Sequence, residues 1–66
     1  MNNENYQEID CLEQLLHVIS NPELFRLAYK PTGKIIFATA EYFKRKSIYE
    51  LESCIRQKQI YFQEKI

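Results

Sequence analysis

One tight turn between two apolar runs constrains the fold more than any other stretch of this sequence. Residues 24–29 read LFRLAY and residues 35–40 read IIFATA, and the residues between them include Pro31 and Gly33. Proline presets φ for the second position of a type I or II turn, and Gly33, the only glycine, adopts positive φ without a steric clash. Both faces of the second run are largely apolar, as in a strand that is covered on two sides or paired with a partner. The sequence therefore predicts a β-hairpin.

The first arm of this hairpin has a helical alternative. Asn21, Pro22 and Glu23 are also a good helix start, with a polar cap, a proline at the first helical position and an acidic first turn. Leu24–Tyr29 would then be a short helix, and the strand at residues 35–40 would have to pair across a dimer to satisfy its backbone groups. A hairpin satisfies those groups within one chain, so it is the preferred interpretation.

Apolar residues at three- and four-residue steps predict a helix on each side of the hairpin, over Asn5–Ser20 and Ser47–Glu64. Each range opens with a polar residue and has a glutamate three positions later, the pattern of a capping box. The first range is followed by Asn-Pro, which ends a helix. The second contains no glycine or proline, so it is predicted as one long helix.

These elements define one α+β domain over residues 1–66, in the order helix, two-stranded antiparallel hairpin, long helix, with both helices on one face of the hairpin. The last helix is longer than the strands, so its final turns, with Tyr61, Phe62 and Ile66, would extend beyond the sheet. Exposed aromatic side chains at the end of a small domain favour an interface. A homodimer is therefore expected.

Composition limits the class of protein. The 66 residues include nine basic and nine acidic side chains, with an acidic excess before residue 30 and a basic excess after it. No apolar run approaches the ~20 residues that span a bilayer, and the polar, acidic first ten residues are unlike a signal peptide. Two lone cysteines, Cys11 and Cys54, indicate buried free thiols in a reducing cytoplasm, and a bridge between them is the less favoured alternative.

No catalytic or metal-binding pattern is present in the sequence. His17 is the only histidine, and neither a His-x₃-His nor a Cys-x-x-Cys pair occurs. A single glycine excludes a glycine-rich phosphate loop. We therefore expect a protein that is not an enzyme and that uses no cofactor or metal.

Aromatic and basic residues of the second half suggest a non-enzymatic interaction module: an adaptor, inhibitor or regulator that binds a partner protein. The predicted partner-binding residues are Tyr42, Phe43, Lys44, Arg45, Tyr61 and Phe62. The alternative is a nucleic-acid-binding transcriptional regulator that uses Lys44–Lys46 and the helix after Ser47. Salt separates the two, because phosphate binding weakens steeply as the salt concentration rises.

Three stretches of the sequence resemble known families. Lys30–Thr39, followed by Tyr49-Glu50-Leu51, resembles the opening hairpin of PAS sensor domains, which implies ligand sensing. A hairpin, then Thr39-x-Glu41-Tyr42, basic residues and a helix, is similar in order to the ββα unit of YegP-like proteins, which pair into dimers. Ala40-Glu41-Tyr42-Phe43, followed by Ser47 and Ile55-Arg56, resembles the helix-turn-helix of excisionase-like regulators, which implies nucleic-acid binding.

Overall fold

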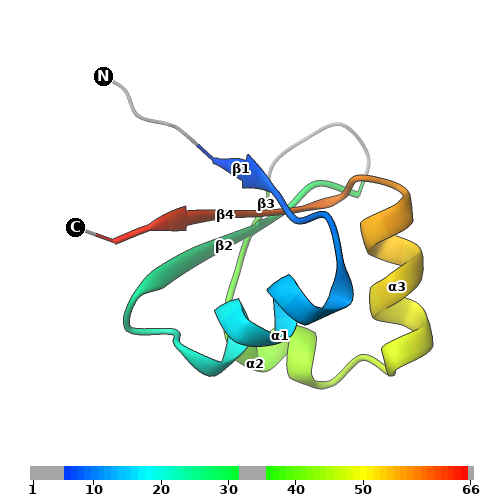
Figure 1. Ribbon diagram of the computed structural model, residues 1–66, viewed down its shortest axis with the longest axis horizontal. Helices are drawn as coiled ribbons and strands as arrows, with labels where there is room; N and C mark the ends of the chain where they lie inside the picture. The colour runs from blue at the N-terminus through cyan, green and yellow to red at the C-terminus, as the bar shows by residue number, and fades with distance from the viewer. Residues whose placement is uncertain (1–5, 32–35, 66) are drawn as a thin grey trace.

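The computed structural model describes residues 6–31 and 36–65 of the chain (Figure 1). In chain order, these residues form β1 (Gln7–Glu8), α1 (Leu12–Ser20), β2 (Phe25–Tyr29), β3 (Ile36–Ala38), α2 (Ala40–Lys44), α3 (Ile48–Arg56) and β4 (Ile60–Glu64). The three helices lie on the same side of the sheet in Figure 1. The fold is therefore α+β, with two layers.

The sheet has the order β1-β4-β2-β3, and every neighbouring pair is antiparallel. Strands β2 and β3 pair as the predicted hairpin, with Leu27 opposite Ala38. The first arm of this hairpin, for which the sequence also allowed a helix, is therefore a strand from Phe25 onward. The turn residues Thr32 and Gly33 lie outside the described residues. The last strand of the chain, β4, occupies a central position, with Phe62 opposite Leu27.

The predicted long helix over Ser47–Glu64 is wrong, and with it the order helix–hairpin–helix. Helix α3 ends at Arg56, and Lys58 takes a left-handed conformation with φ of 57° before the chain enters β4. Burial in β4 alternates, since Ile60 and Phe62 are buried and the intervening Tyr61 is partly exposed. As a central strand, β4 gives both β1 and β2 a hydrogen-bonded neighbour, which a helix at this position would not.

The predicted first helix, Asn5–Ser20, starts too early. Gln7 and Glu8 are a short edge strand against β4, and the backbone N–H of Ile9 donates to the carbonyl oxygen of Ile60 at 2.9 Å. Asn5 lies outside the described residues, and Glu8 is in a strand, so it is not the third residue of a helix. Helix α1 begins after Cys11, whose side chain forms no capping hydrogen bond.

The core lies between the sheet and the helices. Helix α1 packs against α2, α3 and β2, because its apolar residues recur at helical spacing on one face. The buried side chains that form the main cluster are Ile9, Leu15, Val18, Ile19, Leu27, Ala40, Phe43, Leu51, Cys54, Ile60 and Phe62. Within the described residues, no helix combines the length and apolar character that crossing a bilayer requires.

Two further expectations change with this arrangement. Cys54 is buried as expected, but Cys11 is exposed, and both thiols are free, so no bridge joins them. The overhanging end of a long helix, with Tyr61 and Phe62, does not exist because these residues belong to β4. The predicted homodimer therefore loses the structural feature that favoured it.

Candidate functional site

Two capped helices form a corner that carries aromatic, aliphatic and basic side chains. Helix α2 begins after Thr39, whose Oγ1 accepts a hydrogen bond from the Tyr42 backbone N–H at 3.3 Å. Helix α3 begins with the predicted capping box, which is confirmed: the Glu50 backbone N–H donates to Ser47 Oγ, and the Ser47 backbone N–H donates to Glu50 Oε1. The bond from Ser47 holds the pKa of Glu50 below its usual value. We call Tyr42, Lys44, Arg45, Lys46, Ile48 and Tyr49 the α2–α3 corner.

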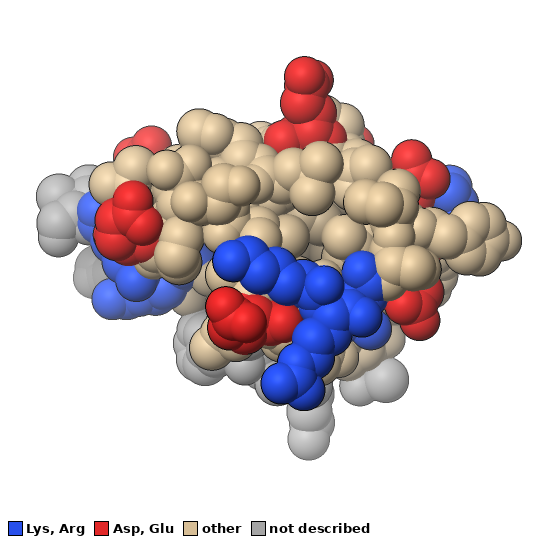
Figure 2. Space-filling view, turned by 90° about the horizontal axis from the view of Figure 1, so that it is seen from below, with Lys and Arg blue, Asp and Glu red and all other residues tan. Residues whose placement is uncertain are grey.

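Three large side chains of this corner are exposed. Tyr49 is 77 % exposed, Ile48 51 % and Tyr42 42 %. Figure 2 views the molecule from the side on which α2 lies in Figure 1, and Lys and Arg side chains gather there beside Asp and Glu. Exposed apolar surface is unfavourable in water, and apolar side chains next to charged ones are a common feature of protein interfaces.

The three basic residues of the corner differ in how they are held. The ammonium of Lys46 lies 5.2 Å from the centre of the Tyr42 ring and 5.8 Å from that of Tyr29, within cation–π range. Lys44 forms an exposed ion pair with Glu41 at 3.8 Å, one helical turn earlier. Within the described residues Arg45 is exposed and forms no ion pair, so its guanidinium is open to a partner.

Tyr42 of the corner belongs to an aromatic cluster that connects the corner to the core. The ring centres of Tyr29, Tyr42 and Phe43 lie 5.3–5.8 Å apart, and the contacts of Phe43 with the other two rings are edge-to-face. The Tyr29 hydroxyl lies 3.9 Å from Cys54 Sγ, within hydrogen-bonding distance for sulfur. Burial, together with this contact to Cys54, raises the pKa of Tyr29 to about 12.

This raised pKa predicts a loss of stability in strong alkali. A tyrosine with an unfolded pKa near 10 and a folded pKa of about 12 contributes its full stabilisation below pH 10, and that contribution is lost as the pH rises through 12. Urea unfolding at pH 9 and pH 12 should therefore show a smaller loss for Tyr29→Phe than for the natural protein. Tyr49→Phe, which changes an exposed ring, should behave as the natural protein does. An equal loss in all three proteins would contradict the prediction.

The structure divides the predicted partner-binding residues between three places. Tyr42, Lys44 and Arg45 lie together at the α2–α3 corner and are exposed. Phe43 and Phe62 are instead core residues, at 0 % and 8 % exposure, so neither presents its ring at the surface.

Tyr61 lies apart from the corner. It alternates with the buried Phe62 and so faces away from the helices, where its hydroxyl donates to the Lys58 carbonyl oxygen at 3.0 Å. The ammonium of Lys30 lies 5.8 Å from the centre of the Tyr61 ring. The six predicted residues therefore do not form one surface.

Sequence reasoning missed Ile48 and Tyr49. Ile48 has the spacing of the buried stripe of α3, but it is the first residue of that helix and projects beyond the core. The capping box at Ser47 was the available signal, because it places both residues in the first turn of α3.

Metal ligands do not cluster in the part of the chain that the structure describes. There, no group of three or more His, Cys, Asp or Glu residues is placed to hold a metal ion. The ring of His17 packs edge-on against Phe25, with ring centres 5.6 Å apart.

Comparison with protein-family models, with curated proteins and with solved structures returned no match to this chain. The hairpin shared by the PAS and YegP resemblances is present as β2 and β3, and the segments of the helix-turn-helix resemblance form α2 and α3. These shared elements are common to many folds, so they do not assign the chain to any of the three families.

Proposed function

We propose that this chain is a small non-enzymatic interaction module that binds a partner protein through the α2–α3 corner. The observation that carries the proposal is the 77 % exposure of Tyr49, close in the chain to Arg45, whose guanidinium forms no ion pair with any described residue. Tyrosine and arginine are the residue types that most often dominate binding free energy at interfaces. The guanidinium of Arg45 favours a carboxylate at the point of contact on the partner.

The nucleic-acid alternative receives less support from the same surface. Of the three basic residues at 44–46, Lys44 pairs with Glu41 and Lys46 lies over two rings, which leaves Arg45. The following helix also carries the exposed residues Glu50 and Glu52, and their carboxylates repel phosphate. A protein partner is therefore the preferred proposal, and adaptor, inhibitor and regulator are all compatible with it.

We further propose that the protein is located in the cytoplasm. Its support is the state of the two cysteines, which are both free thiols although Cys11 is exposed. Exposed thiols persist in reducing compartments and are oxidised more readily in secreted proteins.

The proposal is tested by purifying the tagged chain from its native host with and without nuclease treatment, and by measuring the affinity of each retained partner. Alanine at Tyr49 and Arg45 should weaken binding of the true partner by at least about 30-fold, since hot-spot residues contribute about 2 kcal/mol or more. The matched control replaces Tyr61 and Lys30, a tyrosine and a basic residue away from the corner, and should bind as the natural protein does.

Two results would overturn the proposal. One is a partner whose affinity is unchanged by the Tyr49 and Arg45 substitutions. The other is retention of nucleic acid that disappears steeply with salt and takes any bound protein with it, which would favour the nucleic-acid regulator.

A further inference from the structure

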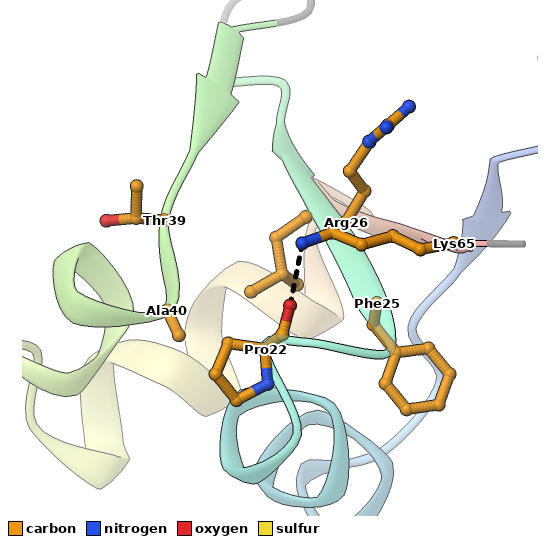
Figure 3. A pocket seen from close by; sticks show the side chains of 7 residues that line it. Pro22, Phe25, Arg26, Thr39, Ala40 and Lys65 are labelled. Carbon is orange, nitrogen blue, oxygen red and sulfur yellow. Dashed lines mark hydrogen bonds between the residues drawn. The ribbon is translucent and has the colours of Figure 1, made fainter.

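A cavity of about 330 Å³ lies where β3 separates from β2 (Figure 3). Strand β2 begins at Phe25, but β3 pairs with it only from Leu27 onward, because the chain turns at Thr39 into α2. This divergence leaves the start of β2 uncovered on one side. The volume is at the lower end of the range of small-molecule sites, about 300–1,000 Å³.

The walls of this cavity are mainly apolar, with contributions from Pro22, Leu27 and Ala40. Leu27 and Ala40 are core residues whose remaining accessible surface lies at this edge of the core. A ligand that filled the cavity would therefore remove apolar surface from water, which favours an apolar chain or ring.

Lys65 extends along the mouth of the cavity and is fixed at two points. Its backbone N–H donates to the Leu24 carbonyl oxygen at 2.8 Å, and its Nζ donates to the Pro22 carbonyl oxygen at 2.8 Å, as the dashed line in Figure 3 marks. An ammonium has three donors, so two remain for a ligand. The position of this charge is set by the backbone of the α1–β2 connection.

The charged residues that line the cavity, Arg26 and Lys65, are both cations. Glu23 and Glu64 are neighbours of the lining in sequence, but they are exposed, and within the described ranges neither forms an ion pair with Arg26 or Lys65. Figure 3 shows Arg26 beside Lys65, with its guanidinium directed away from Pro22. Lys65 therefore places a positive charge at the mouth of a mainly apolar cavity.

We propose that this cavity binds a small monocarboxylate with an apolar chain. The chain lies against Pro22, Leu27 and Ala40, and the carboxylate accepts hydrogen bonds from the free donors of Lys65, with the charge of Arg26 nearby. Charge-assisted bonds of this kind are stronger than bonds between neutral groups. The site is separate from the α2–α3 corner, and the inference does not depend on the proposed function.

The test is an NMR titration of the full chain, labelled with ¹⁵N, using sodium hexanoate. Hexan-1-ol and hexylammonium chloride serve as controls with the same chain but no charge or the opposite charge. Hexanoate should shift the amide signals of Leu27, Ala40 and Lys65 most, hexanol less and hexylammonium least. Equal shifts from all three compounds, or shifts spread evenly over the surface, would overturn the proposal.

A charge variant decides the role of Lys65. Lys65→Gln should weaken hexanoate binding about tenfold and leave hexanol binding unchanged, because it removes one charged hydrogen-bond donor. Lys58→Gln, which removes another exposed lysine, is the matched control and should bind hexanoate as the natural protein does. Unchanged hexanoate binding by Lys65→Gln would show that the carboxylate is held elsewhere.

Discussion

Replacing Phe62 with alanine is expected to lower the free energy of unfolding by about 3–5 kcal/mol, the usual cost of truncating a buried phenylalanine. Phe62 is 8 % exposed, lies opposite Leu27 in the central strand pair, and packs edge-on against Phe25 with ring centres 5.7 Å apart. A domain of 66 residues has little stability beyond this amount. The variant should therefore be largely unfolded, which far-UV circular dichroism with urea titration measures directly.

The matched variant is Tyr61→Ala, one residue earlier in β4. Tyr61 faces away from the helices, and its truncation loses the contact with Lys30 and the hydrogen bond to the Lys58 carbonyl oxygen, at an expected cost of about 1 kcal/mol. This contrast between adjacent residues is the signature of a strand. If β4 were instead the end of a helix, alanine would be favourable at both positions wherever they were exposed. Equal effects of the two substitutions would contradict the central position of β4.

The part of the fold that follows from local sequence is the part with local partners. Pro31 and Gly33 mark a hairpin whose two arms are neighbours in the chain, and the capping box at Ser47 and Glu50 marks the start of α3. In both cases the interaction that decides the structure joins residues only a few positions apart. Such interactions can be recognised from residue types and spacing alone.

The end of the chain was misassigned because its apolar residues fit two periods. Leu51, Ile55 and Phe62 have helical spacing, while Ile60 and Phe62 alternate with polar or partly polar neighbours as in a strand. The strand is selected by pairing with β2, more than thirty residues earlier, and with β1 at the other end of the chain. Local periodicity carries no information about these distant pairs. The short strand β1 was missed for the same reason.

The candidate surface was predicted in part. Tyr42, Lys44 and Arg45 were predicted because aromatic and basic residue types are common at interfaces, and all three are exposed. Phe43 was selected for the same reason, but it lies three positions after Ala40, and both are buried on the inner side of α2. That spacing was visible in the sequence. It could not be used because no helix was predicted between the hairpin and Ser47.

Replacing Phe43 with alanine is the second substitution for which we expect a loss of about 3–5 kcal/mol in the free energy of unfolding. Phe43 is 0 % exposed, and its ring contacts those of Tyr29 and Tyr42 edge-on. Tyr42→Ala should cost about 1 kcal/mol, since its ring is 42 % exposed and its removal mainly loses the edge-to-face contact and the cation–π contact with Lys46. Thermal unfolding followed by circular dichroism compares the two variants.

Phe43→Leu separates a core role from a binding role at this position. Leucine preserves an apolar side chain of similar bulk, so the cost should be clearly smaller than that of alanine and the domain should stay folded. If Phe43 acts only as a support beneath the corner, folded Phe43→Leu should bind the partner as tightly as the natural protein, whereas folded Tyr42→Ala should bind it more weakly. If Phe43→Leu keeps its stability but loses the partner, Phe43 must become accessible in the complex. The α2–α3 corner would then open when it binds, because a side chain this deeply buried cannot reach a partner while α2 remains packed on the core.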